Sequence, residues 1–327
     1  MRDSDVNLYR PSRLFQEFGP FLGEPGADGT AVSANDIVGA PYRRVLAETT
    51  AIVAHQWRND ITRSALKGFL FYGGVGIGKT TMGRRLTYEL ARIFGGDLFA
   101  GEIAQVSETH GHEHADGIGH HHVHEEPHIH GHDPFSPELA GDDVVLVIVD
   151  GADIARGRYG DSEEQLRKLF QYAREGEFHG HRHEEDPTRR TVLLFDDVES
   201  LFLARSSGGA KEWHFSQNSV FFHAIDELDT SRTAVVLTTN RIDLVDEAIV
   251  DRFLPYEFGT PPKDVLEEVA RHRAALQKLD DAQLAPVLAA IAKGDDAVKS
   301  IRDVERMVTR AYIAGIIAAP VPVGRLP

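Results

Sequence analysis

Short apolar runs alternate along most of the chain with longer stretches in which apolar residues recur every three or four positions. The short runs are rich in Val and Leu, and their length and bounds predict buried strands. These strands are expected at residues 68–72, 144–149, 192–195 and 234–237. The longer stretches predict helices at residues 45–57, 80–94, 162–174 and 216–228. Strands that alternate with helices indicate an α/β fold, in which helices cover both faces of a parallel sheet.

The pattern changes after Pro261 and Pro262, where three amphipathic stretches follow one another without strands. Helices are expected at residues 264–279, 281–292 and 300–317. At the other end, the first residues are polar and rich in Gly and Pro, which is typical of a segment with little structure. The expected parts are a poorly structured extension at 1–34, an α/β domain at 35–260 and a small all-α domain at 261–327.

Two polar segments interrupt the α/β domain. The first insertion, at about residues 102–141, contains a tract between 110 and 132 that holds ten of the 17 histidines. The second, at about residues 177–189, adds three histidines among acidic residues. Neither composition supplies a packed core, so both segments are expected at the surface.

The composition narrows the classes of function. The formal net charge is −16, whereas nucleic-acid binding is driven by clustered Lys and Arg, so the sequence does not favour nucleic acid as the main partner. Cysteine is absent, which excludes disulfides and thiolate metal sites. Residues 1–10 lack the apolar region of a signal peptide, and the apolar stretch at 312–323 falls short of the ~20 residues of a membrane span. We expect a cytoplasmic protein without a membrane partner.

The first candidate site is the loop between the strand at 68–72 and the helix at 80–94, because it fits G-x-x-x-x-G-K-[ST] in full. Its glycines let backbone N–H groups turn toward an anion, and the following helix adds the partial positive charge of its N-terminus. Lys79 is expected to reach the β- and γ-phosphates, and the Thr80 hydroxyl to ligate Mg²⁺. The motif predicts a P-loop NTPase. The expected nucleotide-binding residues are Gly73, Gly74, Val75, Gly76, Ile77, Gly78, Lys79, Thr80 and Thr81.

The second candidate site is a pair of carboxylates, Asp196 and Asp197, directly after a buried strand. In open α/β sheets ligands bind at the carboxyl ends of the strands, where this pair would lie. We expect Asp196 to hold Mg²⁺ and Asp197 to orient or deprotonate the attacking water. The alternative is that the two acids only cap a helix.

Three further segments resemble modules of the AAA+ family of ATPases. Residues 35–39 (NDIVG) resemble the entry segment, and 235–241 (VVLTTNR) look like the strand that carries the sensor-1 residue, placed at Asn240. Residues 246–253 (DEAIVDRF) resemble the segment that presents an arginine finger to the neighbouring subunit. The resemblance covers about residues 35–318 without the two insertions.

Within AAA+ two subfamily resemblances compete. Residues 196–201 (DDVESL) with Arg205 and Arg252 are similar to ATPases that remodel HORMA-domain proteins. Residues 162–170 (SEEQLRKLF) instead resemble the wider AAA branch of unfoldases and severing enzymes. The sequence leaves the subfamily open.

The resemblance implies a homo-oligomeric ring, usually a hexamer, with ATP between subunits. It implies that Asn240 helps to place the attacking water and that Arg252 reaches the γ-phosphate of the next subunit. The alternative for Arg252 is a surface salt bridge. Arg302, in the segment that looks like sensor 2, is expected to sense the nucleotide from the helical domain, and its alternative is a solvated helix residue.

Two positions depart from the family pattern. The stretch that matches the substrate-gripping pore loop has Arg158 where an aromatic residue is expected and Tyr159 one place later. Tyr159 is either a substrate contact or an ordinary exposed loop residue. At position 197 the family usually has Glu, and the shorter Asp197 is expected to slow hydrolysis, because an error of about 1 Å can cost ~100-fold in rate.

The histidine tract permits three interpretations. Neutral imidazoles bind Zn²⁺ or Ni²⁺, so the tract is a candidate metal site. It is equally well a solvated insertion, or a pH sensor, because the unperturbed histidine pKa lies near 6.5. The candidate metal ligands are His110, His112, His114, His120, His121, His122, His124, His128, His130 and His132.

Three hypotheses of function follow from these observations. The first is an ATPase that couples ATP hydrolysis, with Mg²⁺, to the remodelling of a protein partner. The second is a metal-centre assembly ATPase that uses the histidine tract. The third is a nucleotide switch that binds ATP and hydrolyses it slowly because of Asp197.

Overall fold

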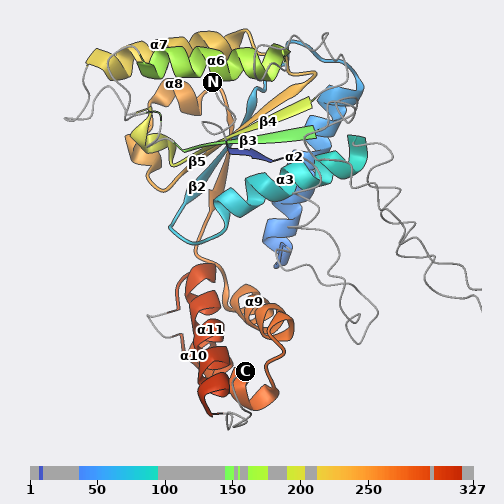
Figure 1. Ribbon diagram of the computed structural model, residues 1–327, viewed down its shortest axis with the longest axis vertical. Coiled ribbons are helices and arrows are strands. Elements are labelled where there is room, and N and C mark those ends of the chain that lie inside the picture. Colours follow the sequence, from blue (N-terminus) through green and yellow to red (C-terminus); the bar gives the residue numbers. More distant parts are fainter. Residues whose placement is uncertain are drawn as a thin grey trace, which may run out of the picture.

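A six-stranded sheet lies at the centre of the α/β domain (Figure 1). The computed structural model describes residues 7–9, 37–94, 144–150, 154, 161–175, 190–202, 212–294 and 298–318. The strands are β1 (Asn7–Tyr9), β2 (Gly68–Gly73), β3 (Val144–Asp150), β4 (Arg190–Asp196), β5 (Thr233–Thr239) and β6 (Leu254–Phe258). Their spatial order is β1-β3-β4-β5-β2-β6, and all neighbours except β1 and β3 pair in parallel.

Helices cover both faces of this sheet, which confirms the predicted α/β class. The helices are α2 (Ala40–Arg58), α3 (Lys79–Phe94), α6 (Asp161–Glu175) and α7 (Glu212–Asp226). Phe69 and Phe71 of β2 share one buried cluster with residues of α2 and α3, whereas Leu70 between them belongs to a second cluster with residues of α6 and α7. Alternate strand residues point to opposite faces, so β2 is buried on both sides. Figure 1 shows α6 and α7 on one side of the sheet and α2 and α3 on the other.

The two edge strands were not predicted from the sequence pattern. β6 was missed because it is short and contains Pro255, which is typical of an edge strand. β1 lies in the segment that was expected to be poorly structured, and this expectation is wrong for residues 7–9, which pair antiparallel with β3. Three residues are too few to show a periodic pattern, and the register is set by the partner strand, where Leu8 lies opposite Val147.

A small helical domain follows the sheet, as predicted. Its helices are α9 (Lys263–Leu276), α10 (Asp281–Lys293) and α11 (Ile301–Ala318). Asp280 caps α10 with a capping box, in which its side chain and that of Gln283 each accept from the other's backbone N–H. The domain joins the larger one where Val265 of α9 packs beneath Gly39 at the start of α2. Among the described residues, no helix is long and apolar enough to span a membrane.

Candidate active site

The carboxyl ends of three neighbouring strands bring the predicted site residues together at one edge of the sheet. β2 leads into the P-loop, β4 ends at Asp196, and β5 leads to Asn240. Because β4, β5 and β2 are adjacent and parallel, residues far apart in the sequence converge here. Lys79 and Asn240, separated by 161 positions, form a hydrogen bond.

The P-loop needs its glycines for two separate reasons. Gly73, Gly76 and Gly78 have φ values of 141°, 74° and 93°, which L side chains rarely adopt. A Cβ at Gly73 would lie 2.0 Å from the carbonyl oxygen of Phe258, and one at Gly76 would lie 2.8 Å from Cβ of Arg302. The loop therefore keeps a backbone conformation that permits close approach, directly before the N-terminus of α3.

The Lys79 ammonium is buried at the centre of the site. It donates to the carbonyl oxygens of Gly73 at 3.0 Å and Gly74 at 2.7 Å, and to Oδ1 of Asn240 at 2.7 Å. Burial lowers the pKa of Lys79, and the nearby carboxylates oppose this shift. The charge is thus held by neutral oxygens in a desolvated position, where an anionic ligand is strongly attracted.

Thr80 and Asp196 form the candidate magnesium site. The Thr80 hydroxyl donates to Oδ1 of Asp196 at 2.8 Å, and the Thr238 hydroxyl donates to the same oxygen. A hydroxyl and a carboxylate are the hard oxygen donors that Mg²⁺ prefers. Asp196 therefore points at the P-loop from β4 and is more than a helix cap. Thr81, the next residue of α3, is half-buried.

Asn240 connects the P-loop to Asp197. Its side-chain amide donates to Oδ1 of Asp197 at 2.8 Å, while its carbonyl oxygen accepts from Lys79. Asp197 itself is exposed and has φ 53°, a left-handed conformation that is unusual outside glycine. This conformation turns the carboxylate away from the axis of β4 and toward the end of β5, where its backbone N–H also donates to the Thr238 hydroxyl at 3.3 Å.

Glu199 is a third carboxylate of the site that was missing from the sequence-based set. It lies on the short 3₁₀ helix η3 (Val198–Ser200), and its Oε1 accepts from the backbone N–H of Asn240 at 3.2 Å. Its Oε2 is buried and has no hydrogen-bond partner within the described part of the chain. The only signal in the sequence is the third acid two positions after Asp197, which is ordinary for a polar turn.

The helical domain closes the site from the opposite side. The backbone N–H of Arg302 donates to the carbonyl oxygen of Gly76 at 3.1 Å, so the start of α11 is fixed to the P-loop. A cavity of about 390 Å³ lies between them. Its lining includes Gly74, Val75 and Ile77 of the loop, and Ser300, Arg302 and Arg306 of the helical domain. Two guanidiniums and the P-loop backbone thus share one cavity, which suits a nucleotide polyphosphate.

Arg252 is held within its own chain. The arginine pairs with both carboxylate oxygens of Asp226, at 3.0 and 3.2 Å, and donates to the carbonyl oxygen of Ala248 at 3.0 Å. Its guanidinium lies 4.7 Å from the centre of the Phe222 ring. The side chain is still 32% exposed, so the salt bridge foreseen as the alternative is present and leaves the arginine accessible at the surface.

Several predicted residues lie outside the described part of the chain. They are Arg158 and Tyr159 of the expected pore loop, Arg205, the entry residues Asn35 and Asp36, and all ten histidines of the tract. Within the described ranges, no group of three or more His, Asp or Glu side chains is arranged to hold a metal ion. The Zn²⁺ or Ni²⁺ site therefore gains no support and stays a sequence-based prediction.

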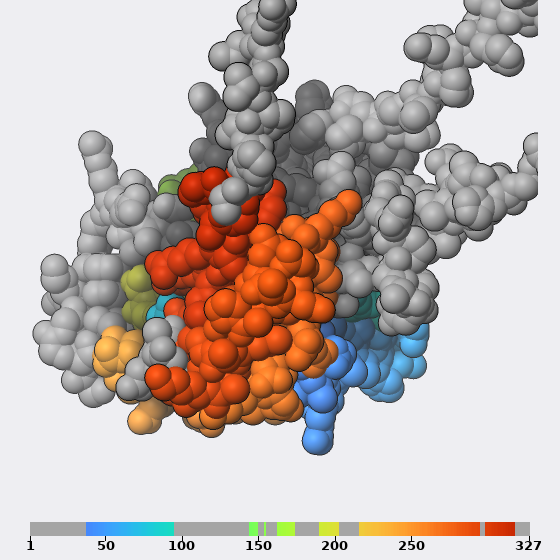
Figure 2. Space-filling view, turned by 90° about the horizontal axis from the view of Figure 1, so that it is seen from below, coloured from blue at the N-terminus to red at the C-terminus, as the bar shows by residue number. Residues whose placement is uncertain are grey.

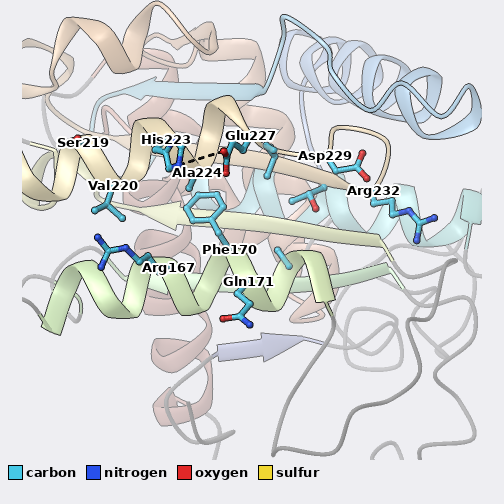
Figure 3. A pocket seen from close by; sticks show the side chains of 13 residues that line it. Arg167, Phe170, Gln171, Ser219, Val220, His223, Ala224, Glu227, Asp229 and Arg232 are labelled. Atoms are coloured by element: carbon cyan, nitrogen blue, oxygen red, sulfur yellow. Dashed lines mark ion pairs between the residues drawn. The ribbon is translucent and has the colours of Figure 1, made fainter.

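A larger cavity of about 460 Å³ lies away from this chemistry, between α6 and α7 (Figure 3). Phe170 points into its centre, and Arg167 and Arg232 lie toward its two ends. An ion pair between His223 and Glu227 lies on its upper side, at 3.5 Å. Its charges are mixed and none of the P-loop residues lines it, so size alone does not make it the nucleotide site.

Comparison with known proteins finds similarity to the family of ATPases that the sequence motifs resemble. A model of the "ATPase family associated with various cellular activities (AAA)" matches residues 131–258. That range contains β3 to β6 with both carboxylates and Asn240, but not the P-loop. The P-loop motif is therefore a separate line of support.

Two curated relatives are similar to parts of the chain. A proteasome-associated ATPase of Acidimicrobium ferrooxidans is 26% identical over 259 residues, which are 77% of this chain and 36% of the relative. An "AAA ATPase forming ring-shaped complexes" of Corynebacterium glutamicum is 31% identical over 106 residues, 32% of this chain and 19% of the relative. The chain thus spans about a third or less of the length of these relatives.

A solved structure shares the fold. The AAA domain of FIGL-1, in complex with ADP, superposes with a TM-score of 0.51 at 16% identity, and covers 91% of this chain and 76% of that one. At this identity the likeness concerns the arrangement of sheet and helical domain only.

Proposed function

The chain carries an ATPase domain of the AAA+ family, and on that premise we propose that it hydrolyses ATP and couples hydrolysis to the remodelling of a protein partner. The observation that carries the proposal is the row of hydrogen bonds from Lys79 through Asn240 to Asp197. These bonds connect Lys79, which is expected to hold phosphate, to Asp197, which is expected to orient water. A phosphate that binds Lys79 can therefore change the position of Asp197.

The positions of the site residues suit the steps of ATP hydrolysis. ATP with Mg²⁺ supplies the γ-phosphate to be transferred and a divalent charge beside it. The Lys79 ammonium holds phosphate oxygens, and Thr80 and Asp196 supply the oxygen ligands for the metal. Asp197 accepts a proton from, or orients, the attacking water, and Asn240 fixes the direction of that carboxylate.

A ring of identical subunits completes this site. The ring is supported by the relatives whose name states that they form ring-shaped complexes, and the resemblance to AAA+ proteins gives six as the usual number. In such a ring Arg252 of one copy reaches the nucleotide of the next, where it stabilises charge on the phosphate. The partially exposed guanidinium is positioned for this contact, provided that it exchanges Asp226 for the phosphate.

A protein substrate is the partner that the relatives favour. The proteasome-associated ATPases of the comparison are named for their association with the proteasome, which supports a protein as the substrate. No feature of the described residues identifies this substrate.

Steady-state ATPase activity with Mg²⁺ tests the proposal most directly. Wild type should turn over, and Lys79→Ala should lose about 10²–10³-fold in kcat/KM, the usual effect of removing one preorganised donor to developing charge. Lys168→Ala is the matched control, because Lys168 is an exposed lysine on α6 that pairs with Glu164 and lies away from the P-loop. A wild type that binds no ATP would contradict the proposal.

A slow nucleotide switch is the second candidate, because of one specific observation. Asp197 is one methylene shorter than the usual Glu, and it lies in an exposed, left-handed position. If its carboxylate stands about 1 Å too far from the water, hydrolysis is ~100-fold slower while ATP binding is retained. ATP binding without measurable turnover, and a gain of turnover in Asp197→Glu, would favour the switch over the motor.

A further inference from the structure

Helix α11 has an exposed stripe with a cationic half and an apolar half. Residues that recur every three or four positions share one side of a helix, and the stripe follows this spacing. Its exposed members are Arg302, Arg306, Thr309, Arg310, Ile313, Ile316 and Ile317. The three arginines span eight positions, or about 12 Å at ~1.5 Å per residue. Figure 2 shows α11, in red, along the surface of the helical domain.

The positive charge of this stripe is not balanced by its own neighbours. Glu305 borders the stripe, but it already pairs with Arg273, at 2.6 Å. Asp303 accepts from Ser300 as part of the cap of α11 and lies 4.0 Å from Arg306. Arg310 has no hydrogen bond or ion pair among the residues that the structure describes. Like charges four positions apart destabilise a helix, so the row is best explained by an anionic partner.

Five exposed acidic residues lie on the other domain, and one of them, Asp243, pairs with the exposed Arg241. They are Asp226 and Glu227 at the end of α7, Asp243 on the 3₁₀ helix η4 (Ile242–Leu244), and Glu247 and Asp251 at α8 (Glu247–Val250). Asp226 contacts Arg252 directly, and Asp251 adds to its negative surroundings. Glu247 and Asp251 have no ion pair with any other described residue. We call these five residues the acidic face.

The position of the nucleotide cavity connects the two surfaces. The cavity opens beside the first turns of α11, since Arg302 and Arg306 line it. If Arg252 of one copy reaches the phosphates in the next, α8 of the first copy must lie against the first turns of α11 of the second. The acidic face then meets the arginine row. Figure 1 places α8 and α11 on separate parts of one chain, which fits a head-to-tail contact.

We propose that the acidic face of one copy docks on the Arg306–Arg310 row of the next copy, and that this charge pairing is the main specific contact between subunits. The inference rests on the proposed ring. Each chain has a formal charge of −16, so two copies repel each other and require local opposite charges to associate. The apolar end at Ile313, Ile316 and Ile317 continues the same side of the helix and extends the contact.

Charge reversal on each surface gives a test with a built-in rescue. The first variant, Thr309→Glu with Arg310→Glu, places two negative charges in the row and removes one positive charge. The second, Glu247→Arg with Asp251→Arg, replaces two of the five negative charges of the acidic face by positive ones. None of these four residues lines the nucleotide cavity. With a non-hydrolysable ATP analogue and Mg²⁺, each variant alone should assemble at least tenfold more weakly in sedimentation, because the introduced side chains then face charges of their own sign.

An equal mixture of the two variants should assemble again. In the mixture the introduced glutamates of one copy meet the introduced arginines of the next, and the unaltered row meets the unaltered acidic face, so the copies alternate. Arg271→Glu is the control, since Arg271 is an exposed arginine of α9 on the same helical domain, and it should assemble as wild type does. Raising NaCl from about 50 to about 500 mM should weaken wild-type assembly by screening this contact.

The outcomes separate this inference from the proposed function. If wild type assembles and each variant assembles equally well, or if the mixture is no better than the variants alone, the charge pairing is wrong while the ring stands. If wild type binds the ATP analogue and stays monomeric at every concentration, both the ring and the pairing are overturned. If wild type binds no nucleotide, the proposed function itself fails.

Discussion

The P-loop site and the surface around Arg252 each contain a cation with acidic residues nearby, but the two cations differ in burial and in how firmly their own chain holds them. Lys79 is buried and has three partners, which lie at or just after the ends of β2 and β5 of the same chain. Arg252 is partly exposed, and its ionic partner is a carboxylate with 55% of its side chain exposed. The first cation is fixed by the sheet of one molecule, whereas the second sits in a contact weak enough to be exchanged. On the proposed function, a single chain holds the nucleotide and a second copy supplies Arg252 to complete the site.

The largest expected effect on activity comes from removing Arg252, the cation that acts between copies in the proposed ring. Arg252→Ala is expected to lower kcat by about 10³-fold, since arginine fingers contribute 10³–10⁵, while ATP affinity changes only a few-fold. ATPase kinetics and a nucleotide-binding titration measure the two effects. Mixing Arg252→Ala with Lys79→Ala should recover part of the activity, because one interface in the mixed ring then has both residues. Mixtures that stay inactive would show that Arg252 acts inside its own chain.

Asp197 and Glu199 are expected to act together, because both contact Asn240. Glu199→Ala is expected to lower kcat by about tenfold with little change in KM, because it releases the backbone of Asn240 that orients Asp197. Glu199→Gln keeps an acceptor oxygen and should lose less. In an Asp197→Glu background the longer carboxylate should depend less on this support, so the loss should shrink. Equal losses in both backgrounds would indicate a purely structural role for Glu199.

The conformation of the P-loop predicts a smaller effect that concerns stability as well as binding. Gly76→Ala forces a Cβ to within 2.8 Å of Arg302 and places alanine at φ 74°, which costs roughly 1–2 kcal/mol. Thermal unfolding should register this loss. Gly259→Ala is the control, because nothing lies within 4 Å of a Cβ there. A Gly76→Ala protein as stable as the control would show that the loop readily adopts another conformation.

The smallest predicted effect is the pH dependence of the Arg252 salt bridge. The hydrogen bond from Arg252 lowers the pKa of Asp226, so its contribution to stability is present above the unfolded pKa near 3.9 and is lost as pH falls through the lower folded value. Because both side chains are partly exposed to solvent, the contribution stays below about 1 kcal/mol. Urea unfolding of Asp226→Asn and wild type should differ slightly at pH 7 and converge near pH 2. A constant difference across this range would contradict the assignment.

The sequence predicted the elements that carry strong periodic patterns. The four central strands, with β2 and β5 among them, and the three helices of the small domain appear where the patterns indicated. Buried strands leave short apolar runs with clear bounds, and amphipathic helices leave apolar residues every three or four positions. β1 and β6 were missed, since short edge strands owe their conformation to the strand beside them. Glu199 was missed for a related reason. Its role depends on the backbone of Asn240, which lies 41 positions away in the sequence.

The sequence by itself determined the chemistry of the P-loop. Gly73 to Thr80 is a continuous segment, and its function follows from local conformation and from the adjoining helix. Only the tertiary structure decided which acids face that loop, that Asn240 joins Lys79 to Asp197, and that Arg252 rests on Asp226. These contacts join residues that a parallel sheet and its crossover helices bring to one edge. The fold also decides which charges of α11 and of the acidic face are exposed, and only exposed charges are available to a second copy.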